Sequence, residues 1–274
     1  IAVEFAGIFN GMGSEVIQLY RGEQILRGFD DDIRERLAKE MINKNIDLRL
    51  NTNITAIEKT DTGVSLTLTD GSTLEADQVM YASGRAPKTD SLGLDKAGVD
   101  LAVNGAIRVD AYGRTNVESV FAVGDVTDRV QLTPVAIKEG HAFALTEFGN
   151  MPTSPEHDAI PTAVFSQPPI GTVGLSEAEA REKYGDIDVF VSDFRPMKHT
   201  LGGSNERAFT KLIVDKASDK VVGAHMIGLD SAEIIQGIGI AVKAELTKAQ
   251  FDATVAVHPS SAEEFVLMRT PRDS

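Results

Sequence analysis

A histidine and two glutamates lie close together near the C-terminal end of the sequence. In the segment VHPSSAEEF, residues 257–265, His258 is followed five and six positions later by Glu263 and Glu264. Histidine changes its charge near neutral pH, and a carboxylate can orient its ring, so this combination suits acid–base chemistry. The alternative is a core histidine beside two surface glutamates, which is the usual interpretation of an isolated histidine.

Composition excludes several other chemistries. The 274 residues include no cysteine, which excludes a disulfide, a thiolate zinc site and a cysteine nucleophile carried by this chain. A net charge of −14 argues against a nucleic-acid partner, because phosphate binding requires a basic surface. No apolar run approaches the ~18–20 residues of a membrane span, and no secretory signal follows Ile1. We therefore expect a cytoplasmic protein with no membrane partner.

The sequence begins inside a helical pattern. Apolar residues at helical spacing run from Ile1 to Met12, with no cap residue before them and no initiator methionine. We therefore expect a fragment whose upstream part is missing.

The first 85 residues are typical of an α/β unit with an antiparallel addition. The residues 1–13 and 29–45 have helical spacing, and three aspartates precede the second helix at its positive end. The remaining elements are strands. In the last two, apolar and polar residues alternate on either side of the turn TDGST, which predicts a hairpin. These strands are expected within residues 14–20, 46–60, 63–70 and 72–84.

Two further regions follow, with boundaries at residues 86–157 and 158–274. The first is expected to contain two short strands within 106–125 and a helix over 132–149. The second is expected to be an α+β domain, an antiparallel sheet flanked by helices. Its strands are predicted at 162–165, 189–194, 209–215 and 221–227, and its helices at 177–184 and 232–244.

Two arginines follow the first expected strand at a position that suits a nucleotide. Small residues in the opening helix are typical of the second half of a dinucleotide-binding motif. An NAD-binding fold places an acidic residue after its second strand, which is the first strand expected in this chain. Here Arg21 stands in that position, with Arg27 six residues on. Arginine can hold a 2′-phosphate with two hydrogen bonds, whereas the alternative is two solvated surface arginines.

A second candidate binding segment is TNVESVFAVGD, residues 115–125, which we interpret as a buried strand ending in Gly124 and Asp125. Glycine would let a ligand approach the backbone, and the aspartate could accept hydrogen bonds from sugar or ribityl hydroxyls. The N-terminus of the helix that starts in LTPVA offers free N–H groups. Alternatively, Asp125 only caps a turn.

Several motifs together resemble a known family. YASGRAPKT, TNVESVFAVGD, LTPVAIKEG, FSQPPIGTVGLSE and HPSSAEEF occur in this order and at the expected separations. They are similar to the flavin-dependent pyridine nucleotide–disulfide oxidoreductases, and above all to the glutathione reductases of plants and bacteria. The resemblance covers the whole chain. It implies a partial NADPH-binding domain at 1–85 that lacks its first strand, a central segment at 86–157 that completes an FAD domain, and a dimerisation domain at 158–274.

The resemblance also implies cofactor contacts. Arg21 and Arg27 would hold the 2′-phosphate of NADPH, and Gly84 and Arg85 would lie beside its nicotinamide nucleotide. Glu4 would lie near the flavin, in an ion pair with a lysine that this chain lacks. The other contacts with FAD would come from the Asp125 side chain, at the ribityl chain, and from the backbone of Leu132 and Thr133, at the pyrimidine ring.

By the same resemblance, His258 would be the acid–base group that protonates the thiolate leaving glutathione disulfide, and Glu263 would orient it. Glu264 would help to bind glutathione. His141 stands where some members have an arginine that contacts a glutathione carboxylate, while others lack it. The cis form of the His258–Pro259 bond would aim the imidazole. The family forms homodimers in which this tail reaches the partner's flavin.

The sequence therefore predicts part of an NADPH-dependent glutathione-disulfide reductase that contains FAD. Its redox disulfide would lie in the missing N-terminal domain, so the chain alone is expected to be inactive. The alternatives are a relative acting on trypanothione, dihydrolipoamide or mercuric ion, and a non-catalytic dimerisation or nucleotide-binding module. Arg21 argues against dihydrolipoamide, because an NAD-dependent enzyme would carry an acidic residue there.

Overall fold

The computed structural model describes residues 1–272. It contains two compact units, one formed by Ile1–Ala82 together with the segment from Ala159 onward, the other by Ser83–Asp158. The expected division into three domains, with boundaries at 85/86 and 157/158, stays a prediction.

The N-terminal segment of the first unit contains a parallel strand pair joined by a helix. α1 (Ala2–Gly11) precedes β1 (Ile17–Leu19), and α2 (Asp31–Asn43) leads to β2 (Asp47–Arg49). β1 and β2 pair in parallel, with Ile17 opposite Asp47. Parallel neighbours require a crossover connection, and α2 provides it. The expected α/β unit is confirmed.

Three antiparallel strands follow this α/β segment, β3 (Ile54–Lys59), β4 (Val64–Leu68) and β5 (Thr73–Ala76). The predicted hairpin around TDGST is confirmed, since β4 and β5 pair across that turn. Gly71 has a φ of +83° there, a conformation that glycine adopts without steric cost. The strand expected to continue to residue 84 ends at Ala76.

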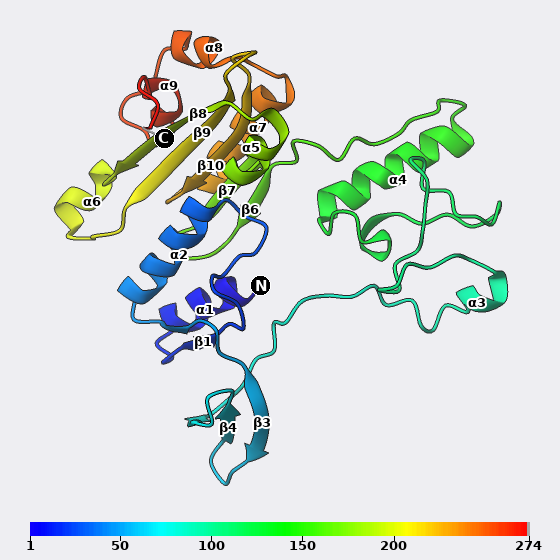
Figure 1. Cartoon of the computed structure of the whole chain (residues 1–274), viewed down its shortest axis with the longest axis horizontal. Helices are drawn as coiled ribbons and strands as arrows, with labels where there is room; N and C mark the ends of the chain where they lie inside the picture. Colours follow the sequence, from blue (N-terminus) through cyan, green and yellow to red (C-terminus); the bar gives the residue numbers. More distant parts are fainter. Residues whose placement is uncertain (273–274) are drawn as a thin grey trace. The chain divides into compact units, whose positions relative to one another are not determined.

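The C-terminal segment forms a five-stranded antiparallel sheet in the order β6-β7-β10-β9-β8 (Figure 1). The four predicted strands are present, and β7 is an addition that its own glycines and the two prolines before it concealed. Gly171 in β7 is required by packing, because a Cβ there would lie 2.5 Å from the Ser231 carbonyl oxygen. The strands are β6 (Thr162–Val164), β7 (Ile170–Gly174), β8 (Ile187–Phe194), β9 (Ala208–Asp215) and β10 (Val221–Ile227).

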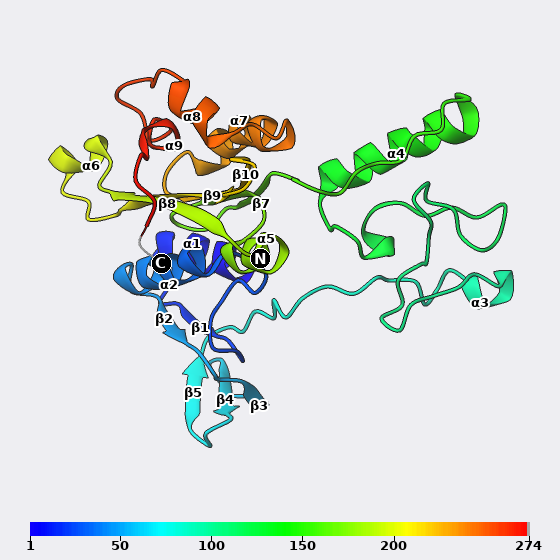
Figure 2. The same cartoon turned by 45° about the horizontal axis from the view of Figure 1, so that its top comes forward.

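Helices cover both faces of this sheet (Figure 2). On one face lie α7 (Ser231–Lys243), α8 (Lys248–Ala253) and α9 (Glu264–Leu267), whose buried side chains pack against Leu212 and Val214 of β9. On the other face lie α1, α2 and α5 (Glu177–Tyr184); Phe209 and Ile213 of β9 belong to the clusters there. A short helix, α6 (Met197–Gly202), lies between β8 and β9 in the chain. The expected α+β arrangement is confirmed.

A buried lysine lies on the same face of β9 as Phe209 and Ile213. The Lys211 side chain is 1% exposed, and its ammonium lies 2.9 Å from Asp30, 2.5 Å from Asp32 and 2.7 Å from Glu177. Asp30 is also 1% exposed and caps two helices, since it accepts hydrogen bonds from the N–H groups of Asp32 in α2 and Glu177 in α5. Arg272 adds a second positive charge by pairing with Asp32 and Glu177. The network joins α2, α5 and Arg272, near the end of the chain, to β9.

The second unit contains α3 (Leu94–Ala97), the 3₁₀ helix η1 (Gly124–Thr127) and α4 (Thr133–Phe148). The helix expected over 132–149 is confirmed. The two strands expected within 106–125 are wrong, because that segment makes only isolated bridges, at Ile107, Arg114 and Phe121. A strand needs a neighbouring strand for its ladder, and no other strand in the described part of the chain pairs with this segment.

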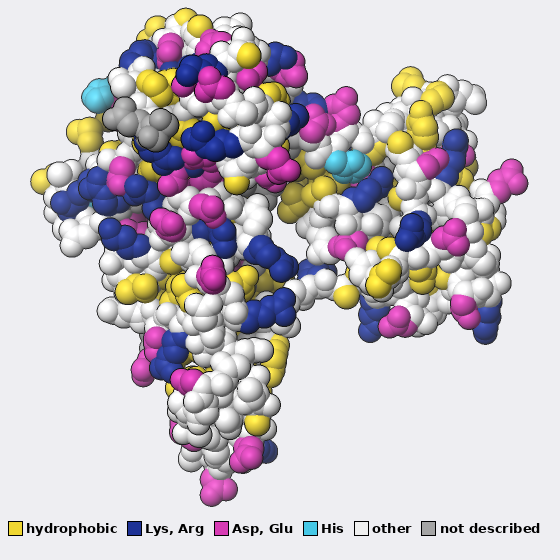
Figure 3. Space-filling model, viewed as in Figure 1, with side chains coloured by type: hydrophobic (Ala, Val, Ile, Leu, Met, Phe, Trp, Pro, Cys, Tyr) yellow, Lys and Arg dark blue, Asp and Glu magenta, His cyan; other side chains and the backbone are white. Residues whose placement is uncertain are grey.

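None of the helices within residues 1–272 is long and apolar enough to cross a membrane. Figure 3 shows acidic and basic side chains mixed over the face in view.

Replacing Lys211 by methionine should destabilise the protein strongly. The change leaves three carboxylates together without their shared cation, and breaking a buried ion pair costs about 3–5 kcal/mol. Urea unfolding measures the effect. Lys216→Met is the control, since this exposed lysine lies 3.6 Å from Asp186, and we expect a loss below about 1 kcal/mol. Equal losses in the two variants would contradict the assigned importance of the buried network.

The network should also make stability depend on pH through Glu177. Burial raises the pKa of Glu177, but hydrogen bonds from Lys211 and Arg181 outweigh it and lower the pKa from 4.5 to about 2. A lowered pKa in the folded state means that the carboxylate stabilises the fold above pH 4.5 and loses this effect as the pH falls toward 2.

We therefore expect the difference in free energy of unfolding between wild type and Glu177→Gln to shrink as the pH falls from 4.5 toward 2. Denaturant unfolding at several pH values measures it. The control is Glu182→Gln on the same helix, where the side chain is exposed. A difference that stayed constant with pH would count against this role of Glu177.

Candidate functional site

The structure brings His258 and Glu263 together. Nδ1 of His258 lies 3.1 Å from Oε2 and 3.2 Å from Oε1 of Glu263. The His258 side chain is 74% exposed, whereas that of Glu263 is 12% exposed. Because the carboxylate accepts at Nδ1, the tautomer is fixed with Nδ1 protonated, and Nε2 is left for a partner in solution. The arrangement can bind, release or donate a proton at Nε2.

Local structure positions this pair. The His258–Pro259 peptide bond is cis, as the sequence suggested. Ser260 donates its backbone N–H to Glu263 over 3.1 Å and its hydroxyl to the Val257 carbonyl over 2.7 Å. Hydrogen bonds from the Ser260 N–H and from His258 hold the pKa of Glu263 below its ordinary value. Glu263 is therefore an anion at neutral pH, as an orienting group for a histidine must be.

Glu264 points to a different partner from Glu263. Its Oε2 accepts a hydrogen bond from the Ser192 hydroxyl over 2.6 Å, which links the start of α9 to β8. The side chain is half-buried. The two adjacent glutamates thus differ in environment.

Arg21 and Arg27 lie in the loop between β1 and α2, and both side chains are exposed. Neither makes an ion pair within residues 1–272. The loop is held against β2 and the residues after it, since Tyr20 donates to the Arg49 carbonyl and Asn51 donates to that of Gly22. Two guanidinium groups are thus presented to solvent directly after a parallel strand, an arrangement that suits an anion.

Glu4 faces two donors of its own unit. Its Oε1 accepts the Phe165 N–H over 2.9 Å, and its Oε2 lies 3.0 Å from the amino group of Ile1. Burial raises the pKa of Glu4, and the hydrogen bond from the Phe165 N–H lowers it.

In the second unit, Arg85 and Asp125 come together. Their side chains lie 3.7 Å apart, and both are about half-exposed. Gly84, next to Arg85, has a φ of +121°, which only glycine adopts readily. Asp125 lies in η1, not at the end of a strand as expected, yet its carboxylate is accessible.

Leu132 and Thr133 mark the beginning of α4. Leu132 is the N-cap, no side chain caps this end of the helix, and its first turn contains no acidic residue. Backbone N–H groups at such an end are donors for an oxygen or nitrogen ligand atom. His141, two turns along α4, lines a groove of about 250 Å³ together with Lys138, Leu145 and residues 153–156.

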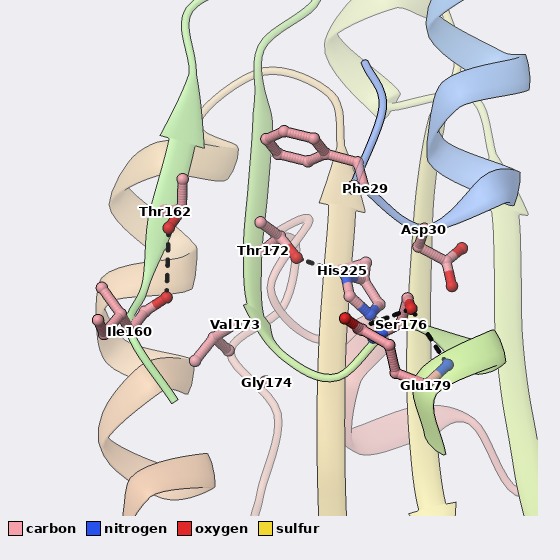
Figure 4. Close-up of a pocket in the computed structure, with 11 residues that line it drawn as sticks. Phe29, Asp30, Ile160, Thr162, Thr172, Val173, Gly174, Ser176, Glu179 and His225 are labelled. Atoms are coloured by element: carbon pink, nitrogen blue, oxygen red, sulfur yellow. Dashed lines mark hydrogen bonds between the residues drawn. The ribbon is translucent and has the colours of Figure 1, made fainter. Parts of the chain in front are cut away.

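Another cavity contains none of the predicted residues. It encloses about 210 Å³ next to the beginning of α2 (Figure 4). His225 lies at its base, where its Nδ1 accepts the Thr172 hydroxyl over 2.5 Å and its Nε2 donates to the Leu175 carbonyl over 3.0 Å. Burial lowers the pKa of His225, so this ring is neutral and its hydrogen bonds are satisfied.

Sequence reasoning also missed a buried carboxylate, Glu139. It occupies the inward stripe of α4 with Val135 and Ala142. A charged residue at the spacing of an apolar stripe was the available signal.

Comparisons with known proteins identify the family of the chain. A family model described as "Pyridine nucleotide-disulphide oxidoreductase" matches residues 1–140, and that of the family's dimerisation domain matches residues 160–269. Glutathione reductase from Burkholderia cepacia is 54% identical, with 99% of this chain and 61% of that protein covered. The chloroplastic/mitochondrial glutathione reductase of Pisum sativum is 53% identical, with 99% and 49% covered.

Two other relatives extend the comparison. Trypanothione reductase from Leishmania donovani is 46% identical, with 99% of this chain and 56% of that protein covered. The solved structure of the HOCl-induced flavoprotein disulfide reductase RclA from Escherichia coli aligns with a TM-score of 0.89 at 28% identity, over 97% of this chain and 61% of that one. The chain thus spans about half to three-fifths of its relatives' length. It belongs to the pyridine nucleotide–disulphide oxidoreductase family.

Proposed function

We propose that the full-length protein reduces glutathione disulfide with electrons from NADPH, through FAD and a redox dithiol. The observation that carries this proposal is the contact between the exposed His258 imidazole and the Glu263 carboxylate, 3.1 Å apart. This chain contains no cysteine, so the dithiol belongs to residues outside it. We accordingly expect the chain alone to lack reductase activity. We also expect the complete protein to be cytoplasmic.

The geometry of His258 supports its proposed role. Attack of a dithiol sulfur on glutathione disulfide breaks the S–S bond and releases one glutathione as a thiolate, which needs a proton. The imidazolium can give that proton from Nε2, while Glu263 holds Nδ1–H and stabilises the cationic ring. The remaining thiol then gives its proton to His258 and attacks the mixed disulfide, which forms the protein disulfide and releases the second glutathione as a thiolate that takes this proton back from His258. Glu263 thus orients His258 without transferring a proton.

The donor groups of this chain fit both cofactors. When bound, FAD would supply the carrier for electrons between NADPH and the dithiol. Exposed guanidinium groups at Arg21 and Arg27 suit a 2′-phosphate, and Gly84 and Arg85 would lie beside the nicotinamide nucleotide. Asp125 would accept from ribityl hydroxyls.

The remaining flavin contacts concern Glu4, Leu132 and Thr133. The Thr133 N–H at the uncapped beginning of α4 suits an acceptor atom of the flavin pyrimidine. The Leu132 backbone would lie beside it, with its own N–H donating to the Val130 carbonyl over 3.0 Å. Glu4 would lie near the flavin.

The substrate contacts and the partner complete the proposal. Glu264, held by Ser192, and His141, in its groove beside Lys138, would bind the charged ends of glutathione. The protein would be a homodimer joined through the expected dimerisation domain, residues 158–274. The match of residues 160–269 with the family's dimerisation domain supports this proposal. Val255 and Val257, beside His258, are 91% and 74% exposed, as expected of side chains covered in a dimer.

Trypanothione is the principal alternative substrate, because trypanothione reductases are also among the relatives. Steady-state turnover of the full-length protein with NADPH and each disulfide decides between them. Faster turnover of trypanothione disulfide or of lipoamide than of glutathione disulfide would overturn the proposed substrate. Absence of turnover with every disulfide would favour a non-catalytic module.

His258→Gln in the full-length protein should leave flavin reduction by NADPH nearly intact and slow the reduction of glutathione disulfide. General acid–base groups contribute ~10²–10⁴-fold to the rate. Glu263→Ala should slow the same half-reaction less, because Glu263 orients the ring. Rapid-mixing kinetics separate the two half-reactions. Equal losses in both would indicate damage to folding and contradict the assigned roles.

Coenzyme choice should depend on Arg21 and Arg27. A charge-assisted hydrogen bond contributes ~1.5–3 kcal/mol, so NADH should bind about one to two decades more weakly per arginine. We expect Arg21→Met with Arg27→Leu to raise the KM for NADPH sharply and to change that for NADH little. The control is Arg49→Met, a partly exposed arginine already paired with Asp47 at 2.7 Å. Equal use of NADH and NADPH by the wild type would show that these arginines are ordinary surface charges.

A further inference from the structure

Glu139 is a buried acidic group that the proposed reaction does not use. Its side chain is 2% exposed and lies on the inward face of α4. A buried carboxylate is costly unless its oxygens are hydrogen-bonded or paired with a cation. The partners of Glu139 therefore indicate why the residue is placed there.

The two carboxylate oxygens have different partners. Oε2 accepts the backbone N–H of Gly124 over 2.6 Å. Oε1 lies 3.0 Å from the guanidinium of Arg129 and 2.6 Å from Nε2 of His157. One side chain thus connects α4 to the start of η1, to the loop after η1 and to the end of the unit's chain segment.

The same turn is closed by further contacts. Gly124 has a φ of +73°, and a Cβ at this position would lie 2.9 Å from Cβ of Ala136, one turn before Glu139 on α4. Thr127 donates its hydroxyl to the Gly124 carbonyl over 2.8 Å, and Arg129 Nε reaches that hydroxyl at 3.3 Å. Both polar groups of the Gly124 backbone are therefore fixed, the N–H by Glu139 and the carbonyl by Thr127.

Asp125 is the next residue after Gly124, and its side chain is about half-exposed. The direction of an exposed side chain in a tight turn follows from the backbone dihedral angles that precede it. A change in the Gly124 conformation would turn the Asp125 carboxylate away. Other hydrogen bonds hold the far end of η1, such as that from Ile107 N–H to the Val126 carbonyl. At its start, Glu139 is the only acceptor of the Gly124 N–H among residues 1–272.

We propose that Glu139 is a positioning residue for the flavin, because its buried carboxylate fixes the Gly124 backbone and thereby the direction of Asp125. The inference rests on the proposed role of Asp125 at the ribityl chain of FAD. Glu139 itself does not touch the cofactor.

The test measures FAD affinity of the full-length apoprotein by quenching of flavin fluorescence. Glu139→Gln keeps the shape of the side chain but removes its charge and directs an NH₂ group at donors. Loss of one charge-assisted hydrogen bond of about 1.5–3 kcal/mol corresponds to roughly 10- to 100-fold weaker binding of FAD. The matched control is Glu147→Gln, on the same helix, which breaks an ion pair with Arg114 at 2.7 Å. Because surface pairs contribute little, its effect should be less than about fivefold.

A double-mutant cycle separates positioning from a general structural role. If Glu139 acts through Asp125, then Glu139→Gln should weaken FAD binding little further in an Asp125→Asn background. A merely structural role predicts additive losses, and equal losses in the Glu139 and Glu147 variants would also overturn the proposal. If Glu139→Gln does not fold, Arg129→Met takes its place, with a smaller loss that Asp125→Asn must also suppress. Unchanged affinity in that variant overturns the proposal.

The same measurements distinguish failure of the inference from failure of the proposed function. If Asp125→Asn leaves FAD affinity unchanged, the role of Asp125 is wrong and the positioning role falls with it. If Asp125→Asn weakens binding while Glu139→Gln does not, only the positioning role is wrong.

Discussion

One ammonium group at the centre of β9 determines how the first unit is assembled. Lys211 is buried, and a buried cation is tolerated only when anionic oxygens replace its water. Asp30, Asp32 and Glu177 supply those oxygens, and each comes from the first turn of a helix or the residue before it. The requirement to neutralise one charge therefore fixes where two helices start above the sheet, and places the exposed loop with Arg21 and Arg27 immediately before α2.

Elements with clear local start and stop signals were predictable, whereas elements defined by long-range contacts were not. α5 was predicted with its observed bounds, because a Ser-x-x-Glu capping box opens it and a glycine ends it. β7 was missed because it contains Gly171. The absence of a Cβ at this position leaves room for α7, which only the packed structure reveals. The expected strands before Gly124 failed for the opposite reason, since apolar alternation does not supply a pairing partner.

The candidate site divides in the same way. His258 and Glu263 are close in sequence, and a turn stabilised by Ser260 is enough to bring them together, so local spacing predicted their contact. The role of Glu139 depends on Gly124, Arg129 and His157, which lie 10 to 18 positions away. Lys211 is similar, because a lysine within an apolar strand does not identify three carboxylates far off in the chain. Sequence patterns reveal neighbours along one element, but they do not reveal partners across elements.

The contact between Asp30 and Lys211 also has a consequence for folding during synthesis. The two residues are 181 positions apart, and the core beside them mixes α1 and α2 with Phe209 and Ile227 of the sheet. During synthesis the N-terminal segment therefore emerges long before the strands that complete its core. Residues 83–158 form a compact unit of their own, and we expect this unit to fold meanwhile. For that interval, the apolar faces of α1 and α2 are a surface that chaperones can recognise.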